Sequence, residues 1–240
     1  MGANRGRPIL RAVDPGRTIA VIGFPRSGNT YLTAWLQWLA RPEVAILDGR
    51  LTHSALDLHR LAKAGTSVVL PIRPALPTCA SLLVRWDGHL DLGTARVVLR
   101  AYRAWYESAT RTLANSAPGI VTVARFEEFT ADPECVAEWP GVSPLLDRER
   151  MATSKDFEQD LHERLAVEEG QGVMLDGIPG SQMISIPDPD REPLLEQARQ
   201  LLASPALARH LQRAQDAYEQ LAAGSYALSR TPSAMDAPGK

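Results

Sequence analysis

The sequence is organised around residues 17–38, which read RTIAVIGFPRSGNTYLTAWLQW. Residues 19–22 are apolar and predict a buried strand, which a short loop follows over residues 23–30. Apolar residues then recur at helical spacing, namely Tyr31, Leu32, Trp35, Leu36 and Leu39. A strand, a glycine-containing loop and a helix N-terminus together predict an anion site, because loop amides and the helix dipole act on the same point.

The loop contains hydrogen-bond donors and no carboxylate. Its donor side chains are Arg26, Ser27, Asn29 and Thr30. The spacing nearly matches the nucleotide-triphosphate signature G-x-x-x-x-G-K-[ST], but Asn29 occupies the lysine position and the cation is Arg26 instead. That lysine normally reaches the terminal phosphates, so the sequence disfavours ordinary ATP or GTP chemistry. A simple turn between a core strand and a core helix is the alternative interpretation.

Residues 25–32, PRSGNTYL, resemble the P-[KR]-[ST]-G-[TN]-T-[WY]-L loop of sulfotransferases. Those enzymes use 3′-phosphoadenosine-5′-phosphosulfate (PAPS) and release adenosine 3′,5′-bisphosphate (PAP). The resemblance implies that the loop binds the 5′-phosphosulfate, with Arg26 beside the bridging oxygen, where a fixed cation stabilises the charge that develops. The binding residues that it implies are Arg26, Ser27, Gly28, Asn29 and Thr30. Tyr31 stands where the family usually has a tryptophan against the adenine, and core packing is its alternative role.

Residues 73–81, RPALPTCAS, resemble the second sulfotransferase motif, R-[DN]-P followed by a serine. The resemblance implies that Arg73 and Ser81 bind the 3′-phosphate, and arginine suits that role because its guanidinium binds phosphate bidentately. The acidic or amide residue of the motif is missing, and Pro74 comes one place early. Alternatively, Arg73 caps a strand end and Ser81 packs in a helix. The family's third motif, R-K-G-x-x-G, is absent, and glycines within residues 170–182 are the substitute that we consider.

A histidine between the two motifs is the candidate general base. Residues 51–53, LTH, match the T-H of a K-T-H segment found in similar sulfotransferases, although the lysine is missing. We therefore expect His53 to take a proton from the acceptor, a hydroxyl or amine of a small molecule or carbohydrate. His59 is the competing candidate. Two other functions stay open: a P-loop small-molecule kinase or NTPase, and a non-catalytic nucleotide-binding protein.

The bulk composition is that of an ordinary globular domain. The 240 residues are 45% hydrophobic and 22% charged, with a formal net charge of -2, so we expect no nucleic-acid partner. The two cysteines, Cys79 and Cys135, show no metal-ligand spacing, and we expect a reduced, cytoplasmic protein without a metal. We find no signal peptide and no apolar run long enough to span a membrane. Neither the acceptor nor the oligomeric state follows from these patterns.

Strands alternate with helices along the chain. This order predicts a three-layer α/β/α domain with a central, mainly parallel sheet and a P-loop-like phosphate-binding loop. We expect strands at residues 19–22, 44–47, 67–72 and 120–123. We expect helices at residues 31–41, 56–65, 77–86, 92–115, 194–203 and 207–221. The domain spans residues 17–227, between a flexible lead-in at 1–16 and a disordered tail at 228–240, with a long loop at 165–190.

Ligands of such sheets bind beyond the carboxyl ends of the strands. The loop after the first strand, Arg73 after the third and residues 125–129 after the fourth all fall at these ends. The topology therefore predicts that the three segments converge on one site.

Overall fold

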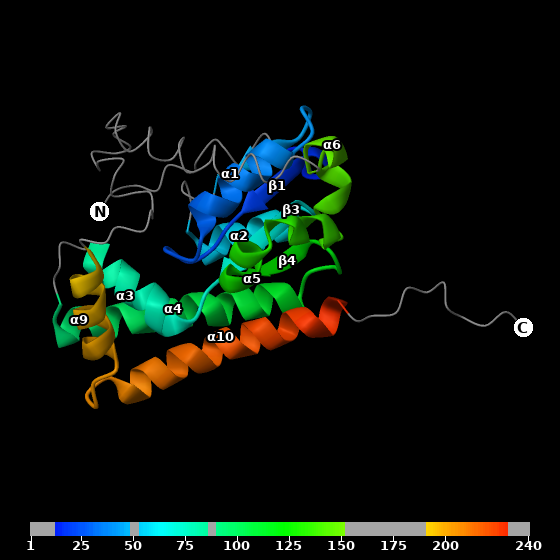
Figure 1. Cartoon of the computed structure of the whole chain (residues 1–240). Helices are drawn as coiled ribbons and strands as arrows, with labels where there is room; N and C mark the ends of the chain where they lie inside the picture. The colour runs from blue at the N-terminus through cyan, green and yellow to red at the C-terminus, as the bar shows by residue number, and fades with distance from the viewer. Residues whose placement is uncertain (1–12, 49–52, 86–89, 152–190, 230–240) are drawn as a thin grey trace, which may run out of the picture.

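The computed structural model describes residues 13–48, 53–85, 90–151 and 191–229 (Figure 1). Its strands are β1 (Thr18–Val21), β2 (Ala45–Leu47), β3 (Ser67–Ile72) and β4 (Val121–Arg125). They form one sheet in the order β2-β1-β3-β4, and every neighbouring pair is parallel. The four expected strands are therefore confirmed to within two residues at each end, as is the parallel sheet. The loop expected at 165–190 and residues 230–240 of the expected tail lie outside the described residues.

The helices follow the expected order. Their bounds are α1 (Asn29–Leu39), α2 (Ala55–Lys63), α3 (Ala75–Arg85), α4 (Leu92–Ala114), α5 (Phe126–Ala131), α6 (Arg148–Met151), α9 (Glu192–Leu202) and α10 (Ala208–Ser229). Helix α3 begins two residues before the expected start at Pro77, which lies in its first turn, where a missing N–H is tolerated. The short α5 was not expected. None of the described helices is long and apolar enough to cross a membrane.

Two apolar cores lie on opposite faces of the sheet. Ile19 and Val21 of β1 point into one core, with the buried residues of α1 and α5. Ala20, between them, points into the other core, which contains residues of α2, α3, α4, α9 and α10. This alternation is what parallel strands buried on both faces require. The described chain is a three-layer α/β/α fold, as the sequence predicted.

The order of the strands creates a switch point between β1 and β3. From β1 the chain runs through α1 to β2, and then through α2 back to β3 on the opposite side of β1. Where the connections leave two neighbouring strands in opposite directions, a crevice forms beyond the carboxyl ends of those strands. Ligands of such sheets bind there. The loop that follows β1 and Arg73, which follows β3, both lie at this edge.

Pro71 occupies β3 without disturbing the sheet. Val69 O accepts from Ile22 N, so the backbone N and O atoms of Val69 point toward β1. Those of Pro71, two residues later in the same strand, point the same way. Pairing with β1 ends at Val21–Val69, whereas Pro71 pairs in register with Ala124 of β4. The proline nitrogen therefore lies where no ladder bond is needed, and this explains how a proline fits in a central strand.

Gly28 is required by both its conformation and its neighbours. Its φ of 96° lies in the left-handed region, and a Cβ there would lie 2.7 Å from Cδ2 of Phe126 and 2.8 Å from Cζ of Phe129. Gly65 has a similar φ of 79° but nothing within 4 Å of an added Cβ. A comparison of substitutions at the two glycines therefore separates the effect of left-handed backbone strain from that of steric crowding.

We predict that Gly28→Ala destabilises the fold more than Gly65→Ala. Gly65→Ala adds only left-handed strain, about 1–2 kcal/mol. Gly28→Ala adds to this the crowding of two aromatic rings, for which overpacking in other proteins costs about 1–3 kcal/mol. Urea unfolding of both variants measures the difference. Equal losses would show that the Phe126–Phe129 pair moves aside freely.

Candidate functional site

Ser27 and Asn29 use their side chains to hold the loop. The Ser27 hydroxyl donates to Phe24 O at 2.6 Å, and Asn29 Nδ2 donates to the same oxygen at 3.0 Å. Both residues are buried, and Ser27 N also bonds to Phe24 O. These side chains were expected to face an anion, but in the structure they face inward. The lysine position of the nucleotide signature thus holds a structural amide.

The first turn of α1 has no side-chain cap. Its N-cap residue is Gly28, which has no side chain to accept from the amides that follow. The first-turn N–H groups of a helix have no partner within the helix, so they and the dipole remain available to an external anion. The Thr30 hydroxyl is half-buried and forms no hydrogen bond with a described residue, which leaves it available at the same turn.

Arg26 connects the two arginine motifs. Its Nε donates to Ser81 Oγ on α3 at 2.8 Å, across 55 residues of sequence. Arg26 is half-buried, and with a φ of 72° it is the one described non-glycine residue in the left-handed region. Such a conformation costs about 1–2 kcal/mol and persists only where the surroundings impose it. Arg26 and Ser81, which the resemblance assigns to opposite ends of the donor, are therefore in direct contact.

Several other arginines surround Arg26. Burial, followed by the charges of Arg85, Arg191 and Arg73, lowers the pKa of Arg26 to about 10. Arg26 stays charged at neutral pH, but the direction shows that its charge is disfavoured by its surroundings. Since Arg73 is among the contributing cations, the two motif arginines act on the same region. A bound anion would instead favour the charged form of Arg26.

Arg73 is held both by its ring contact and by its backbone. Its guanidinium carbon lies 4.3 Å from the centre of the Phe126 ring, a cation–π geometry. Tyr102 and Tyr106 hydroxyls donate to Arg73 O at 2.6 and 3.1 Å, and Arg73 N donates to the Tyr106 hydroxyl at 3.0 Å. The Arg73 Nε is buried and has no hydrogen-bond partner among the described residues. An unpaired buried cationic donor is costly, so Nε is a candidate contact for a bound anion.

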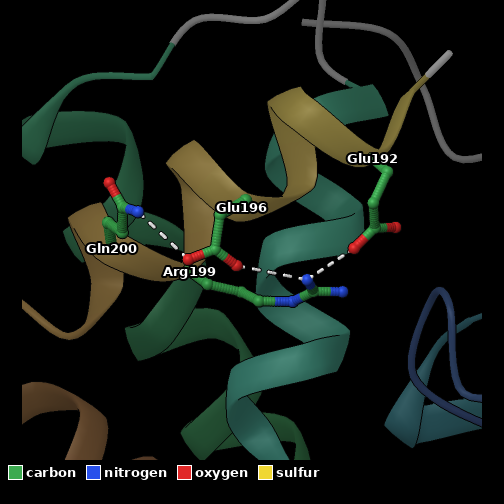
Figure 2. Close-up of polar contacts among 4 residues, drawn as sticks. All are labelled: Glu192, Glu196, Arg199 and Gln200. Atoms are coloured by element: carbon green, nitrogen blue, oxygen red, sulfur yellow. Dashed lines mark hydrogen bonds and ion pairs between the residues drawn. The ribbon is translucent and has the colours of Figure 1, made fainter.

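Arg199, a further cation near Arg73, is already neutralised. Burial lowers the pKa of Arg73, Glu127 raises it, and Arg199 lowers it again. Figure 2 shows Arg199 between two glutamates of its own helix, with Nη1 at 2.8 Å from Glu192 and 3.4 Å from Glu196. Arg199 therefore contributes less to an anion site than its position suggests.

His53 contacts the loop that follows β1 through one of its ring nitrogens. Its Nδ1 lies 2.9 Å from Gly23 O. A carbonyl oxygen can only accept, so Nδ1 carries the proton and the neutral ring has its lone pair on Nε2. Trp105 fixes the backbone by donating from Nε1 to His53 O at 2.7 Å. Burial lowers the pKa of His53, while the bond to Gly23 opposes this and Arg85 adds to it.

Tyr31 packs against Phe129 at one edge of the site. Their ring centres are 6.0 Å apart and the rings are stacked. Tyr31 is also one of the partly buried residues that pack on the α1 side of the sheet. This contact gives the core-packing role of Tyr31 more support than an adenine contact. His59 lies on the exposed side of α2, so His53 is the histidine that touches the loop.

The charge distribution favours an anion rather than a cation. Within the described ranges, no group of three or more histidine, cysteine or acidic residues is placed to hold a metal ion. Arg26, Arg73, Ser81 and His53 come from separate segments and meet around one loop. Such an arrangement can bind a phosphate or sulfate and can accept a proton at His53 Nε2.

Comparisons with known proteins return no match. No family profile matches the chain, and neither a curated protein nor a solved structure matches it.

The sequence reasoning missed the residues of α4 that position the site. Tyr102, Trp105 and Tyr106 all lie on the buried face of α4, where they contact Arg73 and His53. From the sequence, residues 92–115 were predicted only as a helix. Two buried tyrosines four residues apart were the available signal, because a buried tyrosine hydroxyl usually has a hydrogen-bond partner.

We predict that Tyr106→Phe destabilises the protein more than Tyr102→Phe. Tyr106→Phe leaves the buried N–H of Arg73 unpaired, which costs about 1–3 kcal/mol. After Tyr102→Phe, Arg73 O still accepts from Tyr106, so the loss is that of one hydrogen bond, about 0.5–1.5 kcal/mol. The stacked rings remain in both variants. Denaturant unfolding compares them, and a larger loss for Tyr102→Phe would contradict this account of the Arg73 backbone.

Proposed function

We propose that the protein is a sulfotransferase that moves a sulfuryl group from PAPS to a hydroxyl or amine of a small-molecule or carbohydrate acceptor. The observation that carries the proposal is the hydrogen bond between Arg26 and Ser81. In the resemblance these residues belong to separate motifs for the two phosphate-bearing ends of PAPS. Their contact supports a single site that serves both ends.

The proposed roles combine what the resemblance implies with the geometry of the site. The amides at the start of α1 and Thr30 bind the 5′-phosphosulfate. Arg73, with its unpaired Nε, binds the 3′-phosphate together with Ser81. Arg26 stabilises the negative charge that develops on the bridging oxygen. None of these proposed roles requires a metal ion.

His53 acts as the general base at Nε2. It takes the proton of the acceptor hydroxyl as the acceptor oxygen forms its bond to sulfur. The bond between sulfur and the bridging oxygen breaks, and its electron pair leaves with PAP beside Arg26. The bond from Nδ1 to Gly23 O keeps the ring in the tautomer that this step needs.

Neither alternative function receives similar support. A kinase-like NTPase would need a lysine beside Thr30, and the buried Asn29 there donates to loop carbonyls. A non-catalytic binding protein has no need of a histidine held in the base tautomer. Loss of turnover on changing His53, with binding retained, separates this second alternative from an enzyme.

We predict that PAP binds and that Arg26→Ala and Arg73→Ala each weaken its binding at least 10-fold. Removing a charged hydrogen-bond partner typically costs about 1.5–3 kcal/mol, which is 10-fold or more in affinity. Arg60→Ala, on the exposed side of α2, is the matched control and should leave PAP affinity unchanged. Isothermal calorimetry measures all four proteins. Preference for ATP with Mg²⁺ over PAP would favour the kinase alternative.

We predict that His53→Asn lowers turnover by about 10²–10⁴-fold, the usual contribution of a general base, while PAP affinity stays close to that of the wild type. An asparagine amide can replace Nδ1 as donor to Gly23 O, but it has no equivalent of Nε2. Since the pKa of His53 is lowered by burial, the acid limb of kcat/KM should lie below the ordinary histidine value of about 6.5. Unchanged turnover in His53→Asn would remove this residue from the mechanism.

A further inference from the structure

The register of β3 and β4 brings Phe126 beside Arg73. The two strands are parallel, and Ile72 pairs with Arg125 at their carboxyl ends. Arg73 and Phe126 are the next residues of the two chains, so they leave the sheet at the same level. The guanidinium carbon of Arg73 lies 4.3 Å from the centre of the Phe126 ring. The first residue of α5 therefore touches the second arginine of the site.

The Phe126 ring also packs against the start of α1. A Cβ at Gly28, the N-cap residue of α1, would lie 2.7 Å from Cδ2 and 3.1 Å from Cε2 of Phe126. The ring of Phe129, which is fully buried, lies edge-to-face with that of Phe126, with 5.6 Å between ring centres. One ring thus contacts both Arg73 and the N-cap residue of α1, and its packing on Phe129 fixes it there.

The Phe126 ring holds Arg73 without consuming its hydrogen-bond donors. Among the described residues, Arg73 Nε has no hydrogen-bond partner and no carboxylate forms an ion pair with Arg73, although the charge of Glu127 raises its pKa. Arg199 is the contrast, because its Nη1 contacts two glutamates of its own helix (Figure 2). An aromatic face attracts a guanidinium through the ring quadrupole, and the N–H groups in the guanidinium plane stay unused. Arg73 is therefore positioned but not neutralised.

We propose that Phe126 is a positioning residue, which holds the Arg73 guanidinium in a fixed place relative to the N-terminus of α1 and so makes the site prefer a ligand with two phosphate groups to a ligand with one. This inference rests on the proposed function, which assigns the 3′-phosphate of PAPS to Arg73 and the 5′-phosphosulfate to α1. A long arginine side chain loses rotamer freedom when it binds a ligand, and this weakens binding. Because the ring orders the side chain in the free protein, that loss is not part of binding.

The test compares PAP with adenosine 5′-phosphate, which lacks the 3′-phosphate. Calorimetry measures both ligands with the wild type and with Phe126→Leu, because leucine is apolar but has no aromatic face. We expect Phe126→Leu to weaken PAP binding by about 2- to 30-fold, the range of a cation–π contact, and to leave the affinity for adenosine 5′-phosphate within about 2-fold. Phe126→Tyr keeps the aromatic face and should keep PAP affinity within about 2-fold.

Two controls separate the contact with Arg73 from the packing of the ring. Phe129→Leu is the matched substitution, since Phe129 packs against the same glycine but Arg73 lies over the ring of Phe126. It should leave the ratio of the two affinities unchanged, with the folding of each variant checked by circular dichroism. In the Arg73→Gln background, Phe126→Leu should change PAP affinity by no more than about 2-fold, because the cation is already absent.

Three results would overturn the inference. Equal losses for the two ligands in Phe126→Leu would show that the ring only supports the start of α1. Unchanged PAP affinity in Phe126→Leu, or an undiminished loss in the Arg73→Gln background, would show that the ring does not act through Arg73.

Failure of the wild type to bind PAP would make the proposed function wrong, and inorganic phosphate then tests the positioning of Arg73 by itself. Phe126→Leu should weaken phosphate binding in the wild-type background and not in the Arg73→Gln background. Equal effects in the two backgrounds, or no phosphate binding by the wild type, would overturn the role of Phe126.

Discussion

The site depends on one hydrogen bond, from Arg26 Nε to Ser81 Oγ. It joins the loop after β1 to the helix after β3, the two strands between which the connections reverse direction. It also holds an arginine whose backbone is in the left-handed region. Without a partner of this kind, a flexible arginine on a strained loop would extend into solvent. The bond therefore fixes where the positive charge of the loop is placed.

The accumulated charge has a cost in the free protein. Burial and neighbouring arginines both lower the pKa of Arg26, and burial lowers those of Arg73 and Arg85 as well. Ligand-free sites with such buried like charges are destabilised, and a ligand that neutralises them stabilises the folded state. The same physical arrangement accounts for both the strain of the free site and its expected preference for a multiply charged anion. The charges that destabilise the free protein at these residues are the ones to which the proposed function assigns anion binding.

Helix α4 positions most of what the site needs. Phe24 of the loop packs edge-on against Tyr102, at 5.1 Å between ring centres, and also against Trp105. Trp105 holds the backbone of His53, and the tyrosines hold that of Arg73. One face of a single buried helix thus orients the loop, the base candidate and the second arginine. Hydrogen bonds from rigid aromatic side chains are well suited to this, because few torsions are left to vary.

Local patterns were sufficient for the architecture and for the location of the loop. The apolar run at 19–22, the glycine at 28 and the spacing of residues 31–39 specify a strand, a turn and a helix, because each depends on period and backbone conformation within a few residues. Arg26, His53, Arg73 and Ser81 were instead named from the resemblance to sulfotransferase motifs, and their roles stay predictions. Which donors face outward did not follow from local patterns, since Ser27 and Asn29 turn inward to a carbonyl of the loop.

Only the tertiary structure decided how these residues meet. The contact of Arg26 with Ser81, the ring of Phe126 under Arg73 and the hydrogen bond from Trp105 to His53 O join segments far apart in the chain. Their geometry depends on strand order, and a single sequence contains no signal of which strands are neighbours. The sequence by itself determined the elements and the position of the loop. Packing of the helices on the sheet determined the site, because only packing brings charges that are far apart in the sequence close together in space.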